Sequence, residues 1–132
     1  MGKYNYYKGK NARRQSAKYY AMRYNEFLDE YNSLKDSVSS MNLDGMPHGT
    51  NVGNPTERLA IRRNFLEQRM EAIENTAKDI DSKNYRFILR YATQGTSYEY
   101  MNTCGGLYMS KSTFHRKLNR FYELLADRLE VN

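Results

Sequence analysis

Cysteine, long apolar runs and export signals are scarce or missing in this chain of 132 residues. Cys104 is the single cysteine, which excludes an internal disulfide framework. Only His48 and His115 accompany it, so the sequence offers no metal-ligand spacing. No apolar run approaches the roughly 18 residues of a membrane helix, and the first residues, MGKYNYY, lack the apolar core of a signal peptide. We therefore expect a cytoplasmic protein with no metal, no cofactor and no membrane association.

The sequence also lacks a recognisable set of catalytic residues. His115 has no carboxylate or nucleophile near it in the sequence that is arranged for a proton relay. Segment 105–112, GGLYMSKS, lacks the spacing of a phosphate-binding loop, and Cys104 beside apolar positions is expected to be a small buried residue. Two acidic pairs are interpreted as solvated surface charge: Asp29 with Glu30, and Asp79 with Asp81. We do not expect an enzyme.

Acidic residues are absent from residues 1–20, and this absence locates the net charge of +6. Six of the 21 basic residues lie there, and the remaining 15 are balanced by the 15 acids. The segment also contains five tyrosines, and basic residues interleaved with aromatic rings suit phosphates and stacked bases. Residues 1–14 are interpreted as a basic, tyrosine-rich arm, with possible phosphate contacts at Lys8, Lys10, Arg13 and Arg14. The alternative is a solvated tail that keeps the protein soluble.

Apolar residues at heptad spacing predict two long helices within residues 15–82. The first series is Ala17, Tyr20, Tyr24, Phe27, Tyr31, Leu34, Val38 and Met41. Residues 42–54 contain three glycines and Pro47, which predict a linker, and Asn54, Pro55 and Glu57 then resemble a capped helix start. The second series is Leu59, Leu66, Met70, Ile73, Ala77 and Ile80, interrupted by Arg63. We expect an antiparallel helical hairpin; a seam left open for self-association is the alternative.

Residues 83–132 predict shorter helices separated by turns. Residues 84–95 form a short helix ended by Gly95, and Thr96 with Glu99 resembles the capping box of a helix over about 97–104. Gly105 and Gly106 indicate a sharp turn before a final helix capped by Ser110. The apolar face of that helix carries Phe114, Leu118, Phe121, Leu125 and Leu129. This order is that of a helix-turn-helix, in an all-α protein.

The opposite face of the final helix carries residues suited to DNA. A helix in the major groove needs donors and acceptors for base edges in its first two turns, and flanking cations for phosphates. The candidate DNA-binding residues are Lys111, Ser112, His115, Arg116, Asn119 and Arg120, with Lys117 as a further possible phosphate contact. The alternative is an amphipathic helix with a solvated polar face.

A family resemblance supports the first interpretation. The segments YRFILRYATQGTSYEYM (85–101) and YMSKSTFHRKLNRFYELLADRL (108–129) resemble the helix-turn-helix of phage transcriptional regulators of the ArpU and RinA type, which is similar to region 4 of bacterial sigma factors. The linker segment MPHGTNVGNPTERLAI resembles the corresponding part of such proteins. The connection between the two helices is longer than the simplest pattern, by about three residues.

The resemblance implies a sequence-specific DNA-binding regulator of a phage or prophage, acting in the cytoplasm of a bacterial host cell and activating late genes. It implies Lys111, Ser112, His115 and Arg116 as contacts to duplex DNA, with RNA polymerase or a second copy of the chain as further partners. Two other functions stay open. One is a small terminase subunit, which binds phage DNA and forms a closed ring, and the other is a helical module that binds a host protein.

Overall fold

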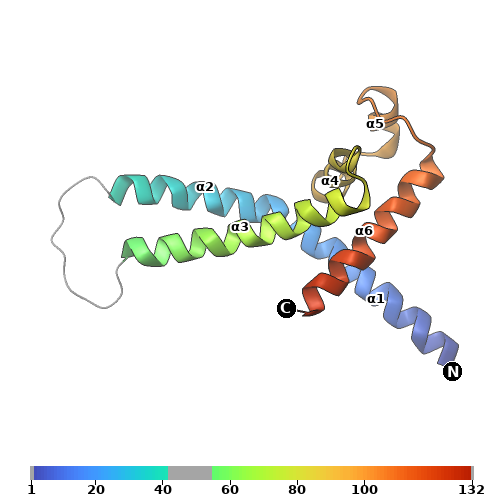
Figure 1. Ribbon diagram of the computed structural model, residues 1–132, viewed down its shortest axis with the longest axis horizontal. Coiled ribbons are helices and arrows are strands. Elements are labelled where there is room, and N and C mark those ends of the chain that lie inside the picture. Colours follow the sequence, from blue (N-terminus) through green and yellow to red (C-terminus); the bar gives the residue numbers. More distant parts are fainter. Residues whose placement is uncertain (1, 42–54, 132) are drawn as a thin grey trace.

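The protein is built from α-helices. The computed structural model describes residues 2–41 and 55–131, with side chains for 11–34 and 55–130, and every regular element in these ranges is helical (Figure 1). The helices are α1 (Gly2–Met22), α2 (Tyr24–Met41), α3 (Pro55–Ile80), α4 (Tyr85–Gln94), α5 (Tyr98–Thr103) and α6 (Lys111–Val131). Among them, none combines the length and the apolar character needed to span a bilayer. The all-α prediction is confirmed.

Helices α2 and α3 lie side by side and antiparallel, and they project from the rest of the molecule (Figure 1). Phe27 of α2 and Leu66, Met70 and Ile73 of α3 are buried in the shared core, as expected for an antiparallel hairpin. The residue that interrupts the second apolar series, Arg63, places its guanidinium 5.2 Å from the centre of the Tyr31 ring. The predicted linker 42–54, and the side chains of Val38 and Met41, lie outside the described residues.

The N-terminal helix differs from the sequence prediction in two ways. Residues 2–14, expected to be an arm, form the first part of α1, and the expected continuous helix is interrupted at Arg23. The Arg23 N–H bonds to the carbonyl oxygen of Tyr20, three residues back, at 3.0 Å. This break separates two packing directions, because α1 packs on α6 and α4 whereas α2 packs on α3. Ala17 and Ala21 are fully buried on α1, and their small side chains permit close approach of the neighbouring helices.

Helix α4 ends where the sequence predicts, but the cap of α5 is one residue later than expected. Gly95 has a φ of 72°, and the N–H groups of Gly95 and Thr96 bond to carbonyl oxygens in the last turn of α4. Because Thr96 belongs to this closing turn, it is not the cap of α5. Ser97 takes that position, with an extended backbone and its Oγ 3.1 Å from the Tyr100 N–H.

The connection from α5 to α6 turns at Gly106 and ends at the predicted cap. Gly106 has a φ of 86°, a value that side-chain-bearing residues rarely adopt. Leu107 after it is fully buried, which fixes the connection to the core. Ser110 accepts a hydrogen bond from the Thr113 N–H at 3.2 Å, which confirms it as the cap of α6. The apolar face of α6 is buried as predicted at Phe114, Leu118, Phe121 and Leu125, and half-buried at Leu129.

The hairpin core makes a first prediction. Leu66 is fully buried in α3, so Leu66→Ala leaves a cavity and should lower the free energy of unfolding by about 2–5 kcal/mol. Leu28 on α2 is 37% exposed, and Leu28→Ala should cost less than about 1 kcal/mol. Urea denaturation followed by circular dichroism measures both values. Equal losses in the two variants would contradict the packing described for the hairpin.

Candidate nucleic-acid interface

Four of the six predicted DNA-binding residues lie on one exposed side of the first half of α6. Ser112, Arg116, Asn119 and Arg120 are all exposed, and we refer to this set as the open face. Within the described residues, Arg116, Asn119 and Arg120 form no hydrogen bond or ion pair, and Ser112 only approaches the Ser110 hydroxyl at 3.4 Å. The open face therefore offers two arginines, an amide and a hydroxyl to a ligand.

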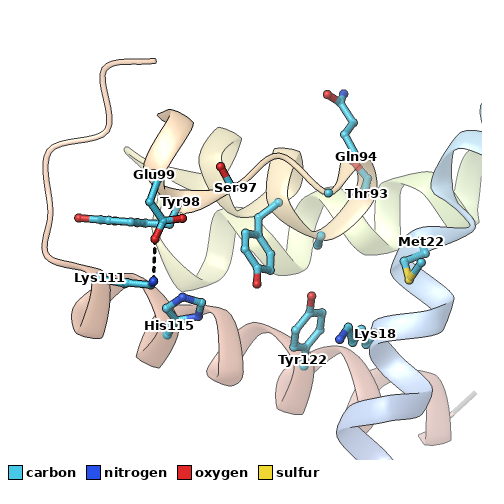
Figure 2. Close-up of a pocket in the computed structure, with 13 residues that line it drawn as sticks. Lys18, Met22, Thr93, Gln94, Ser97, Tyr98, Glu99, Lys111, His115 and Tyr122 are labelled. Carbon is cyan, nitrogen blue, oxygen red and sulfur yellow. Dashed lines mark hydrogen bonds and ion pairs between the residues drawn. The ribbon is translucent and has the colours of Figure 1, made fainter. Parts of the chain in front are cut away.

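The other two predicted DNA-binding residues, Lys111 and His115, are oriented differently. Lys111 Nζ lies 2.6 Å from Glu99 Oε2 of α5 (Figure 2). His115 is half-buried, and the centre of its ring lies 5.8 Å from that of Tyr91 and 5.7 Å from that of Phe114. The Lys111–Glu99 hydrogen bond raises the pKa of the lysine and lowers the pKa of the carboxyl. Both groups therefore remain charged at neutral pH, and the structure separates Lys111 and His115 from the open face.

The predicted phosphate contacts Arg13 and Arg14 are engaged by the second half of α6. Arg14 Nε lies 3.0 Å from Glu123 Oε1, Arg13 Nε lies 3.0 Å from Glu130 Oε1, and Arg13 also pairs with Asp127. The hydrogen bonds that Arg13 donates to Asp127 and Glu130 raise the pKa of its guanidinium. Both arginine side chains thus form ion pairs with carboxylates of α6 and are not surrounded by solvent alone. The side chains of Lys8 and Lys10 lie outside the described residues.

The remaining predicted phosphate contact, Lys117, anchors α6 to the end of α3. Its Nζ lies 2.6 Å from Asp81 Oδ2, and Asp81 Oδ1 accepts the backbone N–H groups of Lys83 and Asn84, each at 3.0 Å. Burial acts to raise the pKa of Asp81, but the hydrogen bond from Lys117 and those from the backbone outweigh it and lower the pKa to about 2.

The interpretation of the acidic pairs as solvated charge is therefore wrong for Asp81, whereas the side chains of Asp79 and Glu30 stay 55% and 42% exposed. The Asp81 side chain is only 10% exposed, because the Lys117 ammonium and two backbone N–H groups surround it. Asp79 pairs with Arg128 of α6, and Glu30 pairs with Arg62 across the hairpin at 2.7 Å. These partners lie 32 or more residues away along the chain, so nothing in the local sequence indicated them.

A cleft of about 600 Å³ lies next to the open face, between α1, α4, α5 and α6 (Figure 2). Lys111 and His115 line it, together with Lys18 of α1 and Tyr122 of α6. Sequence reasoning singled out neither Lys18 nor Tyr122. The only signal for Tyr122 was its position on α6, four residues after Leu118 and one after Phe121, which placed it beside the apolar face.

Other features of this end of the molecule also differ from the sequence analysis. Cys104 is exposed rather than buried, because the turn through Gly105 and Gly106 carries it away from the core while Leu107 is buried instead. Tyr108, just before α6, is 90% exposed and was not recognised as a surface residue. Across the described part of the chain, histidine, cysteine and acidic side chains form no cluster that could hold a metal ion.

Comparison with models of known families, with curated proteins and with solved structures finds no match to this chain.

The anchor beneath α6 makes a second prediction. Asp81→Asn removes the charged partner of Lys117 and should lower the free energy of unfolding at pH 7 by about 1–3 kcal/mol. Because the pKa of Asp81 is lowered from 3.8 to about 2 in the folded chain, its stabilisation is present above pH 4 and is lost as the pH falls through 2. Urea denaturation at several pH values should show the difference from wild type shrinking between those limits.

The control for this experiment is Asp29→Asn, because Asp29 is an exposed aspartate on α2. That variant should match wild type at every pH. A difference between wild type and Asp81→Asn that stays constant from pH 7 to pH 3 would contradict the charged anchor.

Proposed function

We propose that the protein is a sequence-specific DNA-binding regulator that uses the open face of α6 to read duplex DNA. The observation that carries this proposal is the open face itself: Ser112, Arg116, Asn119 and Arg120 are exposed, and the three longer side chains have no partner within the described residues. Arginine suits the guanine edge in the major groove, asparagine suits the adenine edge, and serine contacts either bases or phosphates. An exposed helix carrying this set is what base readout requires.

The elements before α6 agree with such a role. Helix α5 and the turn through Gly106 precede the capped start of α6, which is the order of a helix-turn-helix. Tyr98 donates its hydroxyl to the Met109 carbonyl oxygen at 2.6 Å, and Asn102 donates to the Leu107 carbonyl oxygen at 2.9 Å. These bonds hold the longer connection against α5, so the first turn of α6 starts from a fixed position.

The ion pairs between α1 and α6 support DNA binding indirectly. Beyond Arg120 the exposed side of α6 becomes acidic, with Glu123, Asp127 and Glu130. Carboxylates close to the open face would repel phosphates. Arg13 and Arg14 pair with these acids and therefore reduce the repulsion. In this proposal the basic residues of α1 contribute by neutralising the carboxylates of α6, not by contacting DNA.

The hairpin of α2 and α3 is proposed to contact another protein. Ile61 is 63% exposed on α3, and Phe65 on the same helix is partly exposed beneath the guanidinium of Arg69. Exposed apolar side chains on a projecting hairpin favour a second copy of the chain or RNA polymerase as partner.

Together with the family resemblance, these features lead us to propose a phage or prophage regulator that acts in the cytoplasm of the bacterial host and activates late genes. A helical protein-binding module is the second candidate, favoured by the same exposed residues.

A substitution on the open face tests the DNA contact. Arg116→Ala should weaken binding to the cognate duplex by about 1–3 kcal/mol and relax the base preference at one position. Arg58→Ala is the matched control, because Arg58 is an exposed arginine on the projecting hairpin. Fluorescence anisotropy with labelled duplexes at several salt concentrations measures both variants. If Arg116→Ala and Arg58→Ala bind DNA equally well, α6 does not read bases.

Recovery of genomic DNA fragments tests the regulator itself. The protein is incubated at moderate salt with a pool of fragments from its own genome, and the bound fragments are sequenced. We expect one or two fragments upstream of a gene block, with affinity that falls steeply as salt rises, because binding releases counterions from phosphates. Enrichment of a packaging start, together with a ring-sized particle mass, would instead identify a small terminase subunit. Absence of any bound DNA would leave the protein-binding module.

A further inference from the structure

The cleft between α1, α4, α5 and α6 has the dimensions of a small-molecule site. Its volume is about 600 Å³, within the range of about 300–1,000 Å³ that ligand pockets occupy. Figure 2 shows Lys18 and Tyr122 at one end, Lys111 with Glu99 at the other, and His115 between them. The residues of the open face do not line this cleft. It is therefore separate from the surface proposed to read DNA.

Two phenol hydroxyls and one ammonium in the cleft have no partner among the residues that the structure describes. The hydroxyl groups of Tyr91 and Tyr122 and the ammonium of Lys18 form no hydrogen bond or ion pair with any residue that the structure describes. Burial, and to a lesser extent the nearby Tyr91, raises the pKa of Tyr122 to about 12. Its hydroxyl therefore keeps its proton at neutral pH and can donate it. Two phenol hydroxyls and one ammonium form a donor set for an oxyanion.

Rigid aromatic groups make up much of the remaining wall. The Tyr98 ring lies 5.8 Å from Phe114, measured between ring centres, and its hydroxyl is fixed to the Met109 carbonyl oxygen. The His115 ring stands perpendicular to the Tyr91 ring. Met22 of α1, which is half exposed, adds a polarisable side chain at the edge. Such walls accept a planar aromatic ring, by stacking or edge contact, whereas a small inorganic anion leaves them uncovered.

We propose that this cleft binds a nucleotide unit, with its phosphate at Lys18, Tyr91 and Tyr122 and its base against the aromatic wall that includes Tyr98 and His115. The negative charge of a phosphate suits the ammonium of Lys18, and its oxygens can accept from the hydroxyls of Tyr91 and Tyr122. The unit comes either from a free mononucleotide or from a single strand of nucleic acid. The proposal stands apart from duplex reading, because it uses none of the four residues of the open face.

Isothermal titration calorimetry with the full chain tests this site. Adenosine monophosphate is the probe, adenosine lacks the phosphate, and inorganic phosphate lacks the base. We expect saturable binding of the monophosphate and at least about tenfold weaker binding of the other two, since each lacks one half of the contacts. Lys18→Gln should weaken the monophosphate about tenfold, the loss expected for one charge-assisted hydrogen bond.

Two further variants separate the site from general charge effects. Tyr122→Phe keeps the ring and removes the donor, and should weaken the monophosphate about threefold. Lys83→Gln removes the same charge from an exposed lysine that does not line the cleft, and should leave binding unchanged. Circular dichroism checks that each variant is folded. A single-stranded hexamer of deoxyadenosine distinguishes the sources: tighter binding than the monophosphate, with the same dependence on Lys18, indicates a strand, and equal or weaker binding indicates the free nucleotide.

Several results would overturn the proposal. One is no binding of either the monophosphate or the hexamer, and another is inorganic phosphate binding as tightly as the monophosphate. A third is an equal loss in Lys18→Gln and Lys83→Gln. None of these bears on duplex binding, which is measured separately with Arg116→Ala, so failure of the nucleotide site and failure of the DNA-binding proposal are distinguishable.

Discussion

Burial of the apolar face of α6 holds together helices from both ends of the chain. Phe114, Leu118, Phe121 and Leu125 lie in one core with residues of α1, α3 and α4. The parts of α1, α3 and α4 that pack on α6 would be exposed without it, at a cost of roughly 25 cal/mol for each Å² of apolar surface. Because one side of α6 is committed to the core, its polar side is presented outward. The open face therefore depends on packing rather than on any polar contact of its own.

The charges along the outer side of α6 change sign along the helix. The first half carries Arg116 and Arg120, and the second half carries carboxylates that α1 pairs with arginines. At the far side, Lys117 and Arg128 are tied to aspartates at the end of α3. Helix α6 is thus fixed by charge on two sides while Arg116 and Arg120 of its first half stay exposed. If duplex DNA binds there, this arrangement concentrates positive potential where the helix enters the groove.

The same packing produces the cleft. Helix α1 crosses α6 at its second half, so the space between Lys18 of α1 and Lys111 of α6 is bounded by α4 and α5 without being filled (Figures 1 and 2). Lys111 and His115, which sequence periodicity assigned to the outer face, line this space instead. A helix has no sharp boundary between its faces. A residue at the margin of a face contacts whichever neighbouring element lies beside it, so periodicity alone does not assign it to a face.

Local signals in the sequence determined the helical content, the end of α4 at Gly95, the turn at Gly106, the cap at Ser110 and the apolar face of α6. Each acts within about one helical turn, through backbone conformation or a single hydrogen bond, so it can be read without knowing the fold. Only the tertiary structure decided the break at Arg23, the burial of Asp81 and the pairing of Arg13 and Arg14 with acids more than 100 residues away. Those outcomes depend on which helices pack against each other. That packing is stabilised by contacts between apolar surfaces far apart in the sequence, so no short stretch of sequence predicts it.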